Sequence, residues 1–387
     1  MKKYSTVLAL ALLVAACGGK EKETEWGIFN EPVEVVELPE TAGLNELSVK
    51  WERDVGEAGD DGYAILKPAV DNEGVYVTNR RGGVQRIDPE TGKMMWQTRL
   101  NKDTFAGVGA GEGLAVVALD NGTVVALRTD TGEQAWEVQI NRQISAVPAV
   151  GGGRVIIRTV DGFLMGLDSL SGKTVWSLQR NTPGLSVHGD STPLIAGDTV
   201  ITGLANGKLM ANAVINGRDY WETDLSFIRG TNELERLSDI DSPPVLVGAK
   251  LYAATYQGDV VSVDLESSAI QWRRSISTRL PMSVLKETIV LTDALGGVSA
   301  LNTSTGEEIW SQPSFKGRGI SNPLIIGSRV VIGDANGNIH MLDAEDGALL
   351  QTQKLSKGAI TSLNSWGEGL IAFSVRGAVS AIMITKN

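Results

Sequence analysis

The chain has 387 residues, a formal net charge of −11, 45 glycines and a single cysteine. Its hydrophobic content of 42% and charged content of 21% are ordinary for a globular protein, which excludes wholesale disorder. An acidic chain repels phosphate backbones, so nucleic acid is not expected as a partner. One cysteine permits no internal disulfide, and two histidines supply no zinc-ligand cluster.

The first residues have the pattern of a secretory signal: a basic start, a short apolar run and small residues just before Cys17. The apolar run is too short to cross a bilayer as a mature helix. Small residues followed by the only cysteine resemble a bacterial lipobox, which implies removal of residues 1–16 and lipidation of Cys17. Gly18, rather than aspartate, then resembles an outer-membrane address. An ordinary signal peptide with an incidental buried cysteine is the alternative.

Residues 17–44 are predicted to form a flexible, lipidated tether, because they are rich in acidic residues and show little periodicity. A flexible chain of this length has an r.m.s. span of roughly 30 Å, enough to hold a domain near a membrane. Residues 45–387 are predicted to form one folded domain.

An internal repeat dominates residues 45–387. A glycine-containing hairpin, a second turn rich in Asp, Thr and Gly, and a tryptophan recur in fixed order. From Trp96 onward the tryptophan positions are 40, 40, 45, 51, 38 and 41 residues apart, the last being Gln351. Four antiparallel strands per ~40–45 residues is the period of a β-propeller blade. The equivalent tryptophans are Trp51, Trp96, Trp136, Trp176, Trp221, Trp272 and Trp310.

The two ends of the repeat predict how it closes. The last copy stops at Asn387 before a fourth strand, whereas residues 47–51 supply a tryptophan-bearing strand with no hairpin before it. An N-terminal strand that completes the C-terminal blade closes the ring and removes its free edges. We therefore predict an all-β, eight-bladed β-propeller of four-stranded antiparallel blades, with the tryptophans packed between neighbouring blades.

Two long periods mark insertions, at residues 181–191 and 227–241. Both interrupt the connection from an outer strand to the next inner strand, in successive blades. Insertions in a repeat protein map to loops that often lie on the binding face. We expect the two insertions side by side on one rim, where aliphatic and charged side chains together are typical of a protein-binding site.

A hydrolytic interpretation of the first insertion is weak. His188, Asp190 and Ser191 are the residue types of a catalytic triad. Neighbours in an extended loop do not generally align as base, orienter and nucleophile, however, and the sequence lacks a G-x-S-x-G elbow.

Two cation-binding interpretations lack the further ligands or the glycine that a metal site needs. Asp239 and Asp241 are suitable ligands for a divalent cation, but no further ligands lie near them in sequence. Residues 334–338 resemble a calcium loop, yet they lack glycine at its sixth position and coincide with a hairpin. No metal site is predicted.

The blade pattern A-L-D-x-x-T-G-x-x-x-W resembles the tryptophan-docking repeats of quinoprotein alcohol dehydrogenases. Those enzymes bind pyrroloquinoline quinone in an eight-bladed propeller, typically with calcium. They are longer than this chain, so the shared pattern indicates a shared scaffold rather than shared chemistry. A quinoprotein-like periplasmic redox enzyme remains the alternative function.

The whole chain is more similar to the BamB family, lipoproteins of the outer-membrane β-barrel assembly machinery. Residues 235–244 are similar to that family's R-L-S-D-x-D segment, and residues 185–191 to its L-S-L-R-G-E-S segment. In the family these loops dock onto the POTRA domains of the barrel insertase BamA. His188 stands where arginine is usual, and a neutral histidine lacks the charged bidentate contact of a guanidinium. The implied partner contacts are Leu185, Val187, His188, Asp239 and Asp241.

The same resemblance implies a scaffold that is not an enzyme, has no catalytic residue and carries no cofactor. It implies a palmitate-bearing lipid anchor at the periplasmic face of the outer membrane. The implied partners are a BamA-like insertase within a multi-subunit Bam complex and, as a further candidate, unfolded outer-membrane proteins.

Overall fold

The computed structural model describes residues 33–41, 43–56, 66–180, 191–225, 239–256 and 258–385. Val33–Asn387 form one compact unit. The predicted signal peptide, Cys17 and the first part of the predicted tether lie outside the described residues. Where residues are described, no helix is long and apolar enough to cross a membrane.

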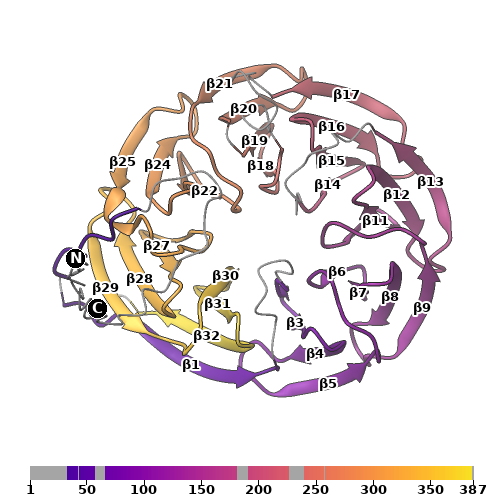
Figure 1. Ribbon diagram of the computed structural model, residues 1–387, viewed down its shortest axis with the longest axis horizontal. Helices are drawn as coiled ribbons and strands as arrows, with labels where there is room; N and C mark the ends of the chain where they lie inside the picture. Colours follow the sequence, from indigo (N-terminus) through magenta and orange to yellow (C-terminus); the bar gives the residue numbers. More distant parts are fainter. Residues whose placement is uncertain are drawn as a thin grey trace, which may run out of the picture. The chain divides into compact units, whose positions relative to one another are not determined.

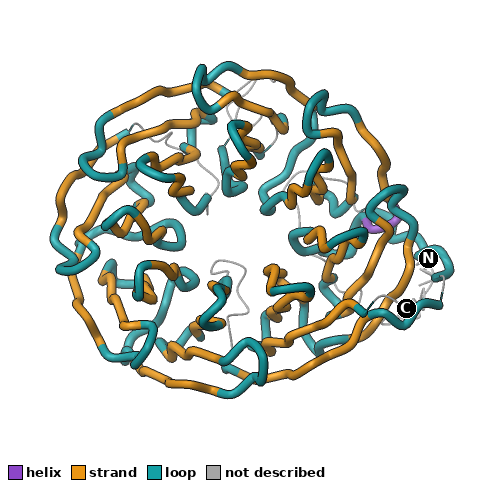
Figure 2. The backbone as a smooth tube through the Cα atoms, turned by 180° about the vertical axis from the view of Figure 1, so that it is seen from behind, coloured by secondary structure: helices purple, strands orange, loops and turns teal. Residues whose placement is uncertain are grey.

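The unit Val33–Asn387 consists of four-stranded antiparallel sheets arranged in a ring, eight of them within the described residues (Figure 1). Each sheet is one propeller blade, with its strands in chain order from the centre outward in blades 1–7. The tube in Figure 2 shows the same ring from behind.

Blade 1 contains β2 (Ala69–Val70), β3 (Val75–Thr78), β4 (Gly83–Ile87) and β5 (Met94–Arg99). Blade 2 contains β6 (Gly109–Gly111), β7 (Leu114–Ala118), β8 (Thr123–Arg128) and β9 (Gln134–Gln139). Blade 3 contains β10 (Ala149–Gly151), β11 (Arg154–Arg158), β12 (Phe163–Asp168) and β13 (Thr174–Gln179). Blade 4 contains β14 (Leu194–Ala196), β15 (Thr199–Gly203), β16 (Lys208–Ala213) and β17 (Asp219–Asp224).

Blade 5 contains β18 (Val245–Val247), β19 (Lys250–Ala254), β20 (Val260–Asp264) and β21 (Ile270–Arg274). Blade 6 contains β22 (Ser283–Leu285), β23 (Thr288–Thr292), β24 (Val298–Asn302) and β25 (Glu308–Gln312), followed by the 3₁₀ turn η1 (Pro313–Phe315). Blade 7 contains β26 (Leu324–Ile326), β27 (Arg329–Gly333), β28 (Asn338–Asp343) and β29 (Leu349–Lys354). Blade 8 contains β30 (Ile360–Trp366), β31 (Gly369–Ser374), β32 (Ala378–Ile384) and β1 (Leu47–Asp54).

The N-terminal strand closes the ring. β1 pairs with β32 in antiparallel register from Leu47 opposite Ile384 to Asp54 opposite Ala378, and it forms the outer strand of blade 8. The predicted eight-bladed architecture and its N-to-C closure are therefore confirmed.

The apolar core is divided among the blade junctions. Eight clusters of buried side chains are found in the described residues, and each joins two successive blades. This division follows from the sequence, because the middle strands carry continuous apolar runs that are buried on both faces. Every blade is therefore stabilised through its two neighbours.

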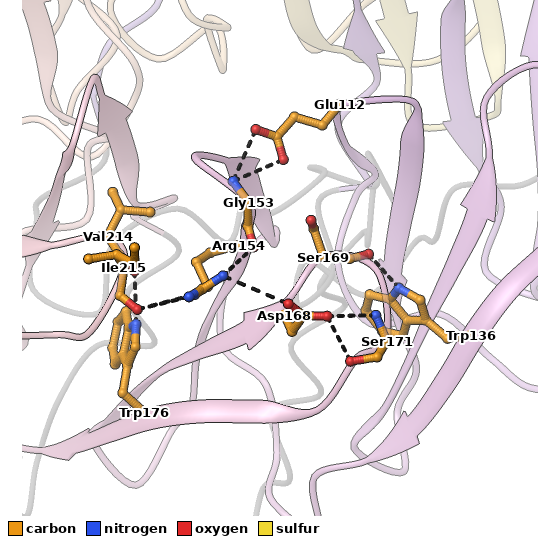
Figure 3. A network of polar contacts seen from close by, with 10 residues as sticks. All are labelled: Glu112, Trp136, Gly153, Arg154, Asp168, Ser169, Ser171, Trp176, Val214 and Ile215. Carbon is orange, nitrogen blue, oxygen red and sulfur yellow. Dashed lines mark hydrogen bonds and ion pairs between the residues drawn. The ribbon is translucent and has the colours of Figure 1, made fainter.

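A tryptophan on the outer strand links each regular blade to the next one. Trp136 of β9 donates its indole N–H to the Ser169 carbonyl of blade 3 at 2.8 Å (Figure 3). The ring lies against Gly172, whose φ is +70° and where a Cβ would be 2.6 Å from the indole. Only glycine tolerates both the positive φ and the close contact with the indole ring. The same donor bond joins Trp51 to Pro89, Trp96 to Thr129, Trp176 to Val214, Trp272 to Thr303 and Trp310 to Ala344.

Polar contacts reinforce these junctions at the rim that carries the tryptophan-binding turns. The Arg154 guanidinium lies 3.8 Å from the Asp168 carboxylate and donates to the Ile215 carbonyl of blade 4 at 3.1 Å (Figure 3). The Glu112 carboxylate of blade 2 accepts the Gly153 N–H of blade 3 at 3.1 Å. These bonds fix the relative rotation of neighbouring blades.

Part of the segment predicted as tether belongs to the propeller. We expected residues 17–44 to lie outside the folded domain, but the compact unit begins at Val33. Leu38 packs against the apolar cluster between blades 6 and 7, and the Val36 carbonyl accepts a hydrogen bond from Arg318. Side chains distant in sequence bind this segment, which composition does not indicate.

Candidate partner-binding site

Two long connections leave the ring in succession. The first long connection, residues 180–193, joins β13 to β14, and the second, residues 225–244, joins β17 to β18. Residues 181–190 and 226–238 lie outside the described residues. The predicted contact residues Leu185, Val187 and His188 fall in the first of these gaps.

The described ends of the two connections meet at the ring. Ser191, which ends the first gap, donates its hydroxyl to the Ser242 carbonyl at 3.3 Å. Ser242 in turn donates its hydroxyl to the Leu280 carbonyl of the following connection at 2.8 Å. Both serine side chains are fully buried. The Ser191 hydroxyl, considered above as a nucleophile, is thus engaged in holding the two connections together.

Asp239 and Asp241 are buried, with exposed fractions of 0% and 5%. The Asp239 carbonyl accepts the Tyr256 N–H of blade 5 at 2.8 Å, and the Ile240 N–H donates to the Leu204 carbonyl of blade 4 at 3.3 Å. This segment is therefore held between hairpin turns of two blades. Ile240 between them is fully buried in the junction of blades 4 and 5, and both carboxylates are buried beside it. Their contact with a partner stays a prediction.

An ion pair that sequence reasoning missed lies at the start of the second long connection. The Arg273 guanidinium contacts the Asp259 carboxylate at 2.8 Å and donates to the Leu225 carbonyl at 2.8 Å. The Asp259 side chain is only 1% exposed, so Arg273 neutralises a buried charge while it holds the chain where the connection leaves. The sequence does carry a signal for this pair: Asp259 directly follows the hairpin residue Gly258, and Arg273 directly follows Trp272.

The tryptophan link is altered at the junction of blades 4 and 5. Ser268, with φ +56°, stands where the other turns have glycine, so its Cβ points toward the usual position of the indole. Trp221 is only partly buried, and in the part of the chain that the structure describes its indole N–H has no carbonyl partner. A cavity of about 540 Å³ opens beside it. Its lining residues are Thr199, Arg218, Asp219, Tyr220, Trp221, Leu265 and Glu266.

The comparison with known proteins identifies the family. The profile described as "Outer membrane protein assembly factor BamB" matches residues 80–312 and 294–383. A BamB from Pseudomonas aeruginosa is 40% identical over 384 residues, covering 97% of this chain and 99% of the relative. The chain belongs to the BamB family. A BamB from Legionella pneumophila is 38% identical over 386 residues and is matched over 100% of both chains.

Solved structures agree with this assignment. The crystal structure of BamB from Moraxella catarrhalis superposes with a TM-score of 0.80 at 29% identity, covering 87% of this chain and 99% of that one. Quinohemoprotein alcohol dehydrogenase from Comamonas testosteroni superposes with a TM-score of 0.69 at 14% identity, covering 88% and 77%. At that identity the likeness to the dehydrogenase shows the fold alone.

A histidine on β28 forms a polar network beside the predicted calcium-like turn of this BamB-family chain. The Asp334 carboxylate accepts the backbone N–H of Asn338 at 2.7 Å and lies 3.2 Å from His340 Nε2. Burial raises the pKa of Asp334, but the bonds from His340 and Asn338 outweigh burial and hold it below its usual 3.8. The carboxylate is therefore engaged by its own turn. Within the described ranges, no three His, Cys, Asp or Glu side chains are grouped to hold a metal.

Proposed function

We propose that the chain is a non-enzymatic scaffold for the assembly of outer-membrane β-barrel proteins. The relatives are named as assembly factors of outer-membrane proteins, and they match this chain over nearly its whole length. The observation that carries the proposal is the convergence of two long connections at Ser191 and Ser242. A rigid ring that presents two adjacent loops is suited to hold a partner rather than to transform a substrate.

The partner in this proposal is the set of POTRA domains of a BamA-like insertase, within a multi-subunit Bam complex. Leu185 and Val187 supply apolar contact from the first long connection, with His188 beside them. Unfolded outer-membrane proteins are a further candidate partner. Lipid on Cys17 anchors the scaffold at the periplasmic face of the outer membrane.

Asp239 and Asp241 take a different part in the proposed interface from the one the sequence suggested. Since neither carboxylate is open to solvent, we assign them to shaping the second long connection instead of touching the partner directly. Burial makes a charge reversal unsuitable as a test, because an uncompensated buried lysine destabilises the fold itself. Replacement by asparagine keeps the size of each side chain and removes only its charge, so any effect on capture comes through the conformation of the loop.

A quinoprotein-like redox enzyme is the alternative from another class. Its support is the shared fold and repeat, at 14% identity to a quinohemoprotein dehydrogenase. It requires a tightly bound quinone, so visible absorbance of the purified protein would be its first sign.

The test is capture of partners from the protein's own membranes in mild detergent, with mass spectrometry of what co-purifies. We expect a POTRA-bearing barrel protein with the parent chain. Leu185→Ala combined with Val187→Ala should reduce its recovery by about tenfold or more, as for truncation of central interface residues. The matched control is Leu170→Ala with Val175→Ala, two exposed apolar residues of blade 3 away from both connections.

Two results would contradict the proposal. One is the absence of a POTRA-bearing protein under conditions that preserve membrane complexes. The other is full recovery by a correctly folded Leu185→Ala, Val187→Ala variant, which would remove the first long connection from the interface. Asp239→Asn with Asp241→Asn should weaken capture less than the apolar pair, because it acts through the shape of a loop.

A further inference from the structure

The chain before β1 is bound to blade 7 at one end through Glu46. We call residues 33–46 the strap. The Glu46 carboxylate forms a bidentate ion pair with Arg329, at 2.9 Å to Nε and 3.0 Å to Nη2. The backbone N–H groups of Glu46 and Leu47 donate to the Gln351 side-chain oxygen at 2.9 and 3.2 Å. Gln351 occupies the position where other blades have tryptophan, and its side-chain oxygen binds the end of the strap.

The other end of the strap is bound beyond the outer strand of blade 6. Arg318 Nη2 donates to the Val36 carbonyl at 2.6 Å. Gly317, with φ +75°, forms a cradle in which a Cβ would lie 3.0 Å from Val35 Cγ2. Leu38 lies between these two anchor points and packs against the cluster that joins blades 6 and 7. In Figure 1 the indigo segment before β1 runs outside the ring beside β29.

The two anchor points lie at opposite rims of the propeller. Arg329 begins β27, just after the turn from β26, whereas Arg318 lies in the connection from β25 to β26. Strands alternate in direction within an antiparallel blade, so all outer-to-inner connections emerge at one rim and all β26–β27-type turns at the other. The strap therefore crosses the outside of blade 7 from rim to rim.

The rim reached by the strap is the one that carries both long connections. The Arg318 carbonyl accepts the Ala335 N–H at 3.0 Å, and the Asp239 carbonyl accepts the Tyr256 N–H at 2.8 Å. Arg318 and Asp239 thus hold the same structural position in their respective blades. We call this side the connection rim; its hairpin turns include the β7–β8 turn, where Asp120 N–H bonds to the Asp103 carbonyl.

We propose that the strap is an intramolecular latch that makes the lipid tether leave the propeller at the connection rim. The membrane and the two long connections then lie on the same side of the ring. Residues 17–32 span at most about 55 Å when fully extended, which limits how far the ring can turn away. This inference rests on the proposed function for the lipid on Cys17, whereas the latch itself is a property of the folded chain.

The latch is tested first by thiol labelling of the lipidated full chain in detergent. Leu38→Cys, which is half-buried, should react with a maleimide more slowly than Glu40→Cys, which is exposed. Adding Arg318→Ala should speed labelling at position 38 by about fivefold to tenfold, because one charged hydrogen bond to the strap is lost. The matched control is Arg274→Ala, which removes a similar bond to the Gly306 carbonyl away from the strap. Equal rates at positions 38 and 40 in the parent chain would overturn the latch.

The orientation is tested on vesicles whose headgroups carry a nitroxide quencher. One label is placed at Asn121→Cys in the β7–β8 turn, on the connection rim. The other is placed at Asp130→Cys in the β8–β9 turn of the same blade, on the opposite rim. We expect stronger quenching at position 121, and a smaller difference between the two positions after Arg318→Ala.

The outcomes separate the latch from the proposed function. Equal or reversed quenching in a protein that floats with the vesicles would overturn the orientation while leaving the lipid anchor intact. Failure to float would contradict the lipid anchor, and with it the orientation. The labelling rates at position 38 would still decide whether the latch exists.

Discussion

The junction of blades 2 and 3 and the junction of blades 4 and 5 each place a tryptophan opposite a turn, but the contacts of the two tryptophans differ. At the first, Trp136 is 7% exposed, bonds to the Ser169 carbonyl and lies on Gly172. At the second, Trp221 is partly buried and faces Ser268, beside a cavity of about 540 Å³. The two junctions thus differ both in the turn residue and in how far the indole is enclosed.

The irregular turn, with Ser268 and the cavity beside Trp221, lies at the rim opposite the second long connection, which leaves from the other end of β17. Regular junctions obey local rules throughout, and departures from such rules are expected near functional regions. Blade 4 is bounded by both long connections at that other rim, so the altered tryptophan contact and the proposed partner-binding loops belong to the same blade but to opposite rims.

The comparison predicts unequal costs for removing the two tryptophans. Trp136→Ala should lower the free energy of unfolding by about 3–5 kcal/mol, the usual cost of deleting a buried large aromatic side chain. Trp221→Ala should cost about 1–2 kcal/mol, because less apolar area is removed from contact. Urea unfolding followed by circular dichroism measures both. Equal costs would show that the partly exposed indole contributes as much as the enclosed one.

Exchanging the turn residues should move each junction toward the other. Gly172→Ser places a Cβ against the Trp136 ring at a positive φ and should cost about 2–3 kcal/mol. Ser268→Gly should raise stability by about 1 kcal/mol, because it relieves the left-handed conformation of a residue with a Cβ.

Tryptophan fluorescence gives a second readout of the same exchange. The emission of Ser268→Gly should shift to shorter wavelength if Trp221 moves into the enclosed position. An unchanged spectrum together with unchanged stability would mean that the cavity, rather than residue 268, sets the position of the indole.

The smallest expected effect on stability concerns the β27–β28 turn of blade 7, which begins with a polar residue where the corresponding turn of blade 4 begins with an apolar one. Asp334 opens the β27–β28 turn, where blade 4 has Leu204. Since the folded-state pKa of Asp334 lies below 3.8, its contribution to stability is present above that pH and is lost as the pH falls through the lower value. His340→Gln should lower stability at neutral pH and make the loss on acidification smaller.

Urea midpoints at about pH 5 and about pH 3 test this linkage. Parallel decreases for the parent chain and His340→Gln would show that other carboxylates dominate the acid loss. The hydrogen bond from His340 to Asp334 would then contribute nothing measurable in that range.

Most of the fold was predictable because its determinants are local. Hairpin turns need glycine or asparagine at set positions, and the tryptophan period repeats once per blade, so blade number and strand order follow from the sequence. The closing strand was predictable because the last repeat lacks an outer strand and residues 47–51 supply a tryptophan-bearing strand with no hairpin before it. The candidate site was predictable only in outline, since an insertion shows where a loop leaves the ring but not how its ends are packed.

The sequence by itself determined the repeat, its closure by residues 47–51 and the place of the two long connections, because each depends on residues close together in the chain. Only the tertiary structure decided that Asp239 is buried, that Trp221 is only partly buried beside a cavity, and that Arg318 binds a segment 282 residues away. These features depend on atoms that meet only when blades pack against one another. Composition and residue spacing do not indicate such long-range contacts.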